Sequence, residues 1–185
     1  MKHPKELHLT NEPEANTYIA EDSLALLIGL VLHQQIPTEK AFHSPYVLRD
    51  RLGKELDATE IASMDPEELD AAFRAKPALH RFPGSMSKRV QAVCEHVTEV
   101  YGGSVQGVWD GVEDADELMQ RMLAIPGFGE YKARIYIGVL AQRFGIRPDG
   151  WENYLPTWPS IVDIADANDL AELKVRKKAW KESQS

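Results

Sequence analysis

Apolar residues recur along this chain at the three- and four-residue spacing of helices, and its β-branched runs are too short to predict strands. The most apolar segment, residues 24–32, is hydrophobic on most sides, which predicts a buried central helix. Asp22 or Ser23 is expected to cap this helix, and a second helix should run from Thr38 to Gly53.

Start and stop signals divide the middle of the chain. Asp65 and Pro66, followed by two acidic residues, form a strong helix start, and Pro77 ends that helix. Ser87 is expected to begin the next helix, which the glycine pair at 102–103 stops.

The last third of the chain predicts a helix that starts at Asp114 or Asp116, breaks at residues 126–129, and resumes over 130–144. Shorter helices should follow toward the C-terminus. The whole pattern predicts an all-α protein of about eight to ten helices.

Composition sets the class of protein. The chain has 185 residues, of which 43% are hydrophobic and 27% charged, as is usual for a soluble globular protein. Its single cysteine excludes an internal disulfide and any cysteine-ligated iron–sulfur or zinc site within one chain. No apolar run approaches the ~18 residues of a membrane span, and the polar residues 1–16 do not resemble a secretory signal. We therefore expect a cytoplasmic protein without a membrane partner.

The net charge of −8 argues against a nucleic-acid ligand, because proteins that bind nucleic acids usually carry a basic footprint. The charge is uneven, however. Acidic residues crowd at 57–70 and 110–117, whereas five Lys and Arg residues gather over 174–181. A local basic face on an acidic body would predict weak, salt-sensitive binding to DNA.

Residues 123–133 (Leu-Ala-Ile-Pro-Gly-Phe-Gly-Glu-Tyr-Lys-Ala) place two glycines in a short turn between two amphipathic helices. Gly127 and Gly129 can adopt positive φ and expose their amides with no Cβ in the way. These amides precede the start of a helix, whose first N–H groups lack intrahelical partners, so the turn is suited to hold a phosphate oxygen. A plain glycine turn between two helices would show the same pattern.

The segment resembles the helix-hairpin-helix motif of the base-excision DNA glycosylases, which reads Leu-Pro-Gly-Val-Gly-x-x-Thr-Ala. The resemblance implies that DNA is bound by Gly127, Phe128, Gly129, Tyr131 and Lys132. It also implies a two-lobed all-α fold in which residues 1–185 form a single unit with a cleft between the lobes.

The lobe boundaries follow from that resemblance. One lobe would span about residues 56–140, with the helix-hairpin-helix element extending over 116–144. The other lobe would combine residues 18–55 with residues 141–185.

Three consecutive hydrogen-bonding side chains, His33, Gln34 and Gln35, end the apolar helix directly before Pro37. Buried amides are unfavourable unless they are paired, so Gln35 is a candidate to fill the space left by an extruded base. The segment is similar to the Ser-Gln-Gln-x-Ser stretch of alkyl-base glycosylases, with His33 in place of the first serine. The resemblance implies that Gln34 and Gln35 lie at the base pocket, whereas simple capping of the helix end is the alternative.

Residues 82–89 (Phe-Pro-Gly-Ser-Met-Ser-Lys-Arg) resemble the Gly-x-x-x-x-Lys-Ala entry to a helix in the same family. Gly84 and a capping Ser87 would free amides at the helix start and place Lys88 and Arg89 near a phosphate. A capped surface helix with solvated charges is the alternative.

A monofunctional glycosylase needs a carboxylate beside the sugar, which stabilises the developing positive charge or orients a water molecule. In the family this aspartate follows the helix after the hairpin, and Asp149, 20 residues past Gly129, holds that place. The residues after Asp149 and the short link before it depart from the family's pattern, and residues 147–150 are also typical of a surface turn. Asp163 and Asp166 are fallback candidates that are also suited to cap helices.

Tyr131 occupies the position at which bifunctional family members carry their Schiff-base lysine. Lys132 is one residue further, and such a shift turns a side chain by about 100° on a helix. We therefore expect no β-lyase activity and a phosphate contact for Lys132. Trp151, Tyr154 and Trp158 are candidates to stack on an extruded base, which would gain about 1–3 kcal/mol, and Tyr131 is a candidate to face the same cavity. The aromatic residues at 151–158 are equally suited to pack the C-terminal helices down.

The resemblance implies a monofunctional DNA glycosylase of base-excision repair, which hydrolyses the N-glycosidic bond of a damaged base in duplex DNA. Alkylated purines are the first expected substrate, and uracil or mismatched bases are the second. We expect a monomer, associated with the bacterial nucleoid through DNA. No metal, iron–sulfur cluster or organic cofactor is expected, although the family's hairpin carbonyls can hold a monovalent cation when DNA is bound.

Two alternatives stay open. A non-catalytic module of the same fold, which recognises damaged or bent DNA, would fit both the acidic charge and the unusual surroundings of Asp149. A protein–protein adaptor, in which the hairpin only joins two helices, would not bind DNA.

Overall fold

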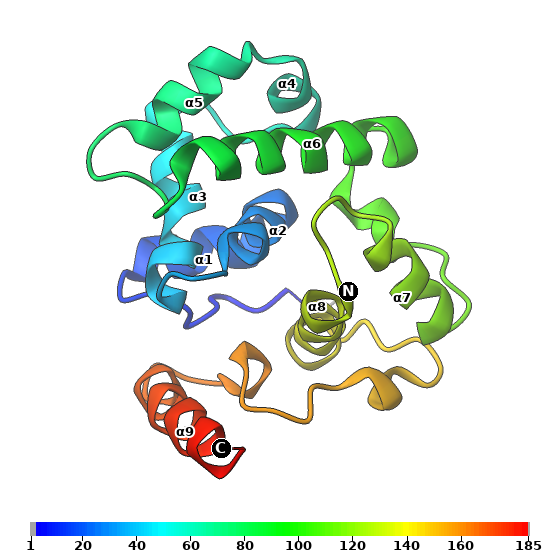
Figure 1. Cartoon of the computed structure of the whole chain (residues 1–185). Helices are drawn as coiled ribbons and strands as arrows, with labels where there is room; N and C mark the ends of the chain where they lie inside the picture. The colour runs from blue at the N-terminus through cyan, green and yellow to red at the C-terminus, as the bar shows by residue number, and fades with distance from the viewer. Residues whose placement is uncertain (1–2, 185) are drawn as a thin grey trace.

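The computed structural model describes residues 3–184, which form nine α-helices, three short 3₁₀ helices and no extended strand (Figure 1). The predicted all-α class is confirmed. In chain order the elements are α1 (Pro13–Glu21), α2 (Ser23–Leu32), α3 (Thr38–Leu52), α4 (Ala58–Ser63), α5 (Pro66–Arg74), α6 (Pro83–Tyr101), η1 (Val105–Val108), α7 (Ala115–Leu123), α8 (Glu130–Arg143), η2 (Trp151–Tyr154), η3 (Ile161–Asp163) and α9 (Asp169–Ser183).

Short acidic side chains begin several helices, as the sequence predicts. Asp22 accepts hydrogen bonds from the first amides of α2, Asp65 from Glu67 N–H, and Asp114 from Glu117 N–H. Gly53 ends α3 in the left-handed conformation, with φ of 67°. These starts and stops depend on residues within one helical turn, so local sequence is sufficient to predict them.

The start of α6 differs from the prediction. The helix begins at Pro83, four residues before Ser87, because proline is already fixed in a helical φ and its missing N–H is not needed in the first turn. Ser87 therefore lies inside the helix, where its hydroxyl donates to the Gly84 carbonyl (3.1 Å). The predicted Ser87 cap is wrong, and Lys88 and Arg89 belong to the second turn of α6. Helix α1, with nine residues, and helix α4, with six, were not predicted.

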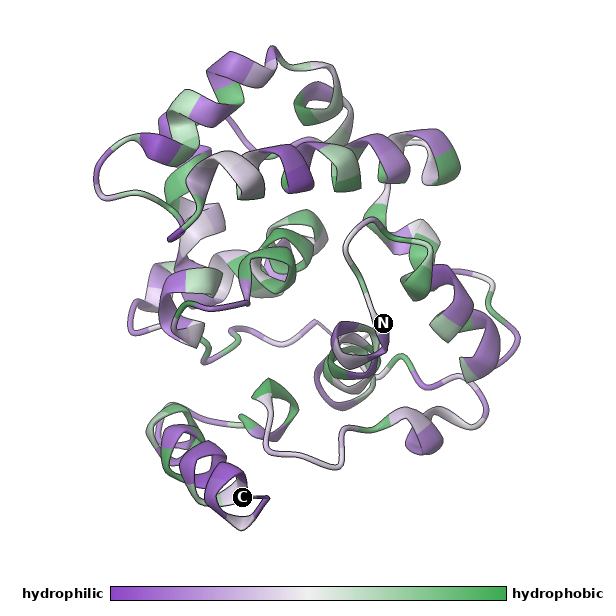
Figure 2. Cartoon of the chain, in the orientation of Figure 1, coloured by the Kyte–Doolittle hydropathy of each residue, from purple (hydrophilic) through white to green (hydrophobic). Residues whose placement is uncertain are grey.

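The core is built around α2, where every residue from Leu24 to Leu32 is buried. Helices α1, α3 and α6 surround α2, and Figure 2 shows it as one of the most hydrophobic segments of the chain. Gly29 allows α3 to approach closely, since a Cβ at this position would lie 2.5 Å from Phe42 Cδ1. Helices α4 and α5 pack on the outer side of α6.

The C-terminal half is organised around α8. Helices α7 and α8 pack as a pair joined by the 126–129 turn, and η2 and η3 cover α8 (Figure 1). Helix α9 is attached through the buried Leu170 and Leu173 and contacts η3. The apolar core is continuous through both halves. Helix α6 packs on α2 across the predicted lobe boundary, and the division into two lobes stays a prediction.

Within residues 3–184, no single helix is long and apolar enough to cross a membrane. The pair α1 and α2 passes on length and composition only when joined across a bend of 111°.

Candidate nucleic-acid interface

The turn between α7 and α8 exposes both of its glycines. Gly127 has φ of 79°, as predicted, whereas Gly129 has φ of −105°, so the prediction of positive φ there is wrong. Phe128 N–H donates to the Ile125 carbonyl (3.0 Å) and closes the turn. The Phe128 side chain, only 7% exposed, packs inward toward the ring of Tyr136. Phe128 therefore anchors the turn from beneath, while Gly127 and Gly129 face solvent.

The first turn of α8 presents backbone amides without a capping side chain. Gly129 is the N-cap, and the first helical bond runs from Ala133 N–H to the Gly129 carbonyl (3.0 Å). The amides of residues 130–132 therefore precede the helical ladder. A Cβ placed on Gly129 would meet no atom within 4 Å, so the space beside the N-cap is open. Open amides at the positive end of a helix are suited to an anionic oxygen.

Arg89 on α6 connects this turn to the loop between α2 and α3. Its aliphatic stem covers one side of Gly127, where a Cβ would lie 2.9 Å from Arg89 Cδ. Its Nη1 donates to Gln34 Oε1 (3.3 Å). The 126–129 turn and residues 33–35, here called the glutamine segment, were singled out separately in the sequence. Because Arg89 contacts both, they lie on one face of the molecule. Lys88 is exposed on the neighbouring part of α6, beside a groove of mixed charge that is also lined by Arg74, Arg81, Glu67 and Asp70.

Lys132, in the first turn of α8, connects the turn to the end of α2 just before the glutamine segment. Its Nζ donates to the carbonyl of Val31 (2.7 Å), 101 residues earlier in the chain. Burial, together with the nearby positive charge of Arg89, lowers the pKa of Lys132 to about 8. Val31 lies in the last turn of α2, where carbonyls lack helical partners, so the contact completes the helix end. The structure thus gives Lys132 an internal partner, and its phosphate contact stays a prediction.

Gln34 and Gln35 behave differently although they are adjacent. Gln34 is held by Arg89 and also donates from Nε2 to the sulfur of Met86 (3.4 Å). Gln35 is exposed and has φ of 57°, the only positive φ of a non-glycine residue in the described chain. The left-handed conformation is unfavourable by roughly 1–2 kcal/mol for residues with a Cβ. Such strain persists where surrounding contacts fix it, and it concentrates at functional sites.

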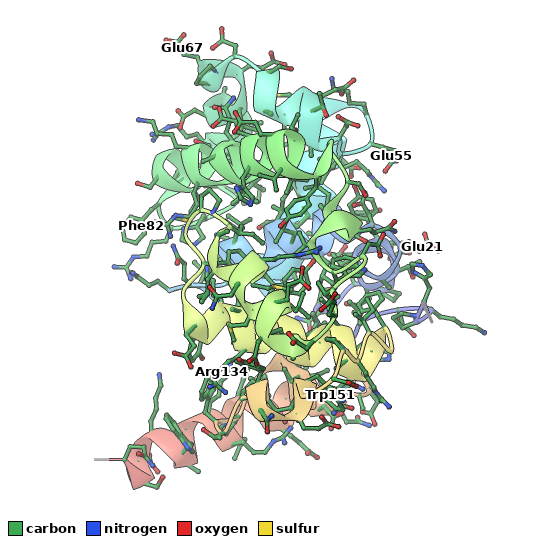
Figure 3. All side chains as sticks on the ribbon, turned by 90° about the vertical axis from the view of Figure 1, so that its right-hand side faces the viewer. Glu21, Glu55, Glu67, Phe82, Arg134 and Trp151 are labelled. Atoms are coloured by element: carbon green, nitrogen blue, oxygen red, sulfur yellow. The ribbon has the colours of Figure 1, made fainter. Side chains whose placement is uncertain are left out.

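Asp149 lies apart from this face. Its carbonyl accepts Ala115 N–H (2.9 Å) at the start of α7, and its side chain is exposed. The 126–129 turn follows the opposite end of α7, a helix of nine residues or about 13 Å. The half-buried Trp151 packs under Arg147, whose guanidinium carbon is 5.3 Å from the ring centre. Figure 3 shows Trp151 away from Phe82, which marks the edge near α6. The fallback candidate Asp163 forms a capping box with Ser160 at η3, and Asp166 accepts the N–H of Asn168 before α9.

An aromatic pair beside the turn combines Tyr131 with Trp158, two residues that the sequence already singled out as candidates to line a base pocket. Tyr131, 56% exposed, stacks on Trp158 with ring centres 4.8 Å apart and an angle of 11° between planes. Trp158 belongs to a loop 27 residues further on, so only the folded chain reveals the pair. His80 and Met86 also contact the glutamine segment, and no sequence signal pointed to them.

Acidic charge gathers at the other end of the molecule. A hollow of about 580 Å³ is lined by Glu21, Asp22, Glu55 and Asp57, with Arg49 among them. Figure 3 shows Glu21 and Glu55 on the edge opposite Phe82. The net charge of −8 is therefore compatible with a face around Arg89, Lys88 and the turn that is not acidic overall.

No group of three or more His, Cys, Asp or Glu residues that could hold a metal ion occurs in the described part of the chain. The monovalent cation implied by the resemblance would use carbonyls of the 126–129 turn. The carbonyl of Ile125, directly before this turn, already accepts Phe128 N–H.

Comparisons with known proteins add no relative: no protein-family model matches the chain, and neither a curated protein nor a solved structure matches it.

Proposed function

We propose that this protein binds duplex DNA through the 126–129 turn and probes base pairs with Gln35, as a damage-recognition protein of base-excision repair. One observation carries the proposal: the open amides of the turn and the exposed, left-handed Gln35 share a face and are tied together through Arg89 and Gln34. Neither feature is needed to complete the core, because Gly129 at the turn and Gln35 are both exposed to solvent.

The two features suit two parts of one ligand. A phosphate oxygen accepts hydrogen bonds from the amides at the start of α8, which fixes the protein on the DNA backbone without reading sequence. The left-handed backbone of Gln35 already directs its side chain for insertion into the base stack. The side-chain amide then hydrogen-bonds to the base that was paired with the extruded base. Extruding a base requires a few kcal/mol, and least for a damaged or mismatched base, so this step selects weak base pairs.

Base excision is the second candidate, and the Tyr131–Trp158 pair is the observation that favours it. The exposed ring of Tyr131 follows the turn directly and offers a stacking surface for an extruded base. Hydrolysis also requires a carboxylate at the sugar, for which Asp149 is the proposed residue. Recognition is the better supported function because Asp149 lies at the far end of α7 from the turn.

The test uses labelled duplexes that carry an alkylated purine, a uracil or a mismatch, each beside an undamaged duplex. Tighter binding to at least one damaged duplex, without abasic sites after hot-alkali treatment, is the expected result. Equal binding to all duplexes would contradict damage recognition. Base release that disappears in Asp149→Asn, with binding retained, would replace recognition by excision.

A further inference from the structure

His80 occupies a buried position directly behind the glutamine segment. It lies between α5 and α6 and is only 2% exposed. The preceding residue is fixed from two sides: Leu79 N–H donates to the Phe73 carbonyl on α5 (3.0 Å), and Ser44 on α3 donates its hydroxyl to the Leu79 carbonyl (2.9 Å). The imidazole is therefore attached to a rigid part of the core.

Both ring nitrogens of His80 are used, and their partners determine the tautomer. Phe82 N–H can only donate, so Nδ1 accepts this bond (3.0 Å). The carbonyl of Gln34 can only accept, so Nε2 carries the hydrogen and donates to it (2.9 Å). Burial lowers the pKa of His80, which favours this neutral form. His80 is thus a fixed bridge between the entry to α6 and the glutamine segment.

The bond to Gln34 acts on the conformation of Gln35. The carbonyl of Gln34 and the amide nitrogen of Gln35 belong to one planar peptide unit. Fixing the direction of that carbonyl fixes the plane from which the φ of Gln35 is measured. Gln35 has φ of 57°, a value that needs support from its surroundings.

We infer that His80 is a positioning residue that holds Gln35 in the left-handed conformation required to enter the base stack. The entry of Gln35 into the base stack rests on the proposed function. The effect of His80 on the conformation of Gln35 does not depend on DNA binding. The side chain of Gln34 contacts Arg89 and Met86, and its N–H donates to the Leu32 carbonyl (2.7 Å), whereas the His80 bond reaches its backbone carbonyl. A core histidine that served packing alone would not determine how Gln35 meets DNA.

Two substitutions separate the two bonds of the ring. In His80→Asn, the shorter amide can still accept Phe82 N–H at the place of Nδ1 but does not reach the Gln34 carbonyl. In His80→Gln, the longer amide can donate to the Gln34 carbonyl from the place of Nε2. His43→Asn is the matched control, because His43 is partly exposed on α3 and pairs with Glu12 (3.3 Å) away from the glutamine segment.

The DNA readout is the fluorescence of 2-aminopurine in a duplex whose weak base pair the protein disturbs, measured with Gln35→Ala as the reference for a missing probe. His80→Asn is expected to lose the fluorescence increase to the level of Gln35→Ala, while Kd changes by less than about threefold because the turn is unaltered. His80→Gln should restore at least half of the increase, and His43→Asn should retain all of it. A full increase in His80→Asn would overturn the inference.

Crystal structures of the variants without DNA provide the second readout. Gln35 is expected to leave positive φ in His80→Asn and to keep it in His80→Gln. The positioning role is overturned if Gln35 keeps positive φ in His80→Asn. It is also overturned if Gln35 loses positive φ in His80→Gln. The His80→Gln structure is sufficient for a decision if His80→Asn does not fold. If Gln35 moves as expected but the wild-type protein binds no DNA, the proposed function fails and the positioning role of His80 stands.

Discussion

Replacing Gly129 with alanine separates DNA binding from folding. Gly129 has φ of −105° and ψ of 178°, an extended conformation that alanine also adopts, and its Cβ would meet no atom within 4 Å. Alanine is a poorer N-cap than glycine by roughly 0.5–1 kcal/mol. It also restricts the unfolded chain, which stabilises the folded state by about 0.4–1 kcal/mol. The two effects oppose each other, so the free energy of unfolding should change by less than about 1 kcal/mol.

The effect on DNA should be much larger, because the added methyl group would stand in the open space at the N-cap, where the phosphate is proposed to bind. Loss of one hydrogen bond to a charged phosphate weakens binding by about 1.5–3 kcal/mol. This corresponds to an increase in Kd of roughly 10- to 100-fold. Fluorescence anisotropy with a short labelled duplex measures Kd, and urea denaturation measures the stability of the same sample.

The matched control is Ser104→Ala, at an N-cap that makes no side-chain hydrogen bond and lies beside the acidic hollow. Its Kd should equal that of the wild-type protein. Gly127→Ala is unsuitable for this purpose, because its φ of 79° and a Cβ contact of 2.9 Å with Arg89 would disturb folding itself. If Gly129→Ala folds normally and binds DNA within about twofold of wild type, the turn does not hold the phosphate and the reasoning is refuted.

Three further predictions concern stability, pH and salt. Gly29→Ala should lower the free energy of unfolding by about 1–3 kcal/mol in urea titrations, because its Cβ would lie 2.5 Å from the buried ring of Phe42. Burial and nearby lysines lower the pKa of His33 to about 3, so the unfolded chain binds a proton that the folded protein does not. His33 should therefore reduce stability as pH falls from about 6.5 toward 3, by up to about 1.4 kcal/mol per pH unit, and His33→Gln should reduce this slope. The basic helix α9 extends toward the edge marked by Phe82 (Figure 3), so Arg176→Gln and Lys178→Gln together should lower the slope of log Kd against log salt by about one to two. An unchanged slope would place α9 outside the interface.

The sequence was sufficient to predict the features that depend on neighbouring residues. Asp22, Asp65 and Asp114 cap helices because each side chain reaches amides two or three positions further along the chain. The break between α7 and α8 follows in the same way from Pro126 and the two glycines. These signals were enough for the all-α class and for the position of the turn.

Features that depend on distant residues could not be predicted. The positive φ of Gln35 is supported by His80, 46 residues from Gln34, and Lys132 completes the end of α2 from 101 residues away. The position of Asp149 depends on how the chain leaves α8 and returns to α7, and the sequence pattern gave only its distance from Gly129 along the chain. The sequence pattern therefore did not show that Asp149 lies apart from the turn, because that separation exists only in the folded chain.

Amide chemical shifts during titration with a short duplex test the central claim most directly. The account predicts that the largest shifts occur at Gly127, at Gly129, at the first residues of α8 and at Gln35, and that the acidic hollow around Glu21 and Glu55 shows none. Shifts confined to other surfaces, or no shifts at DNA concentrations that saturate weak binders, would contradict binding of a phosphate by the open amides of this turn.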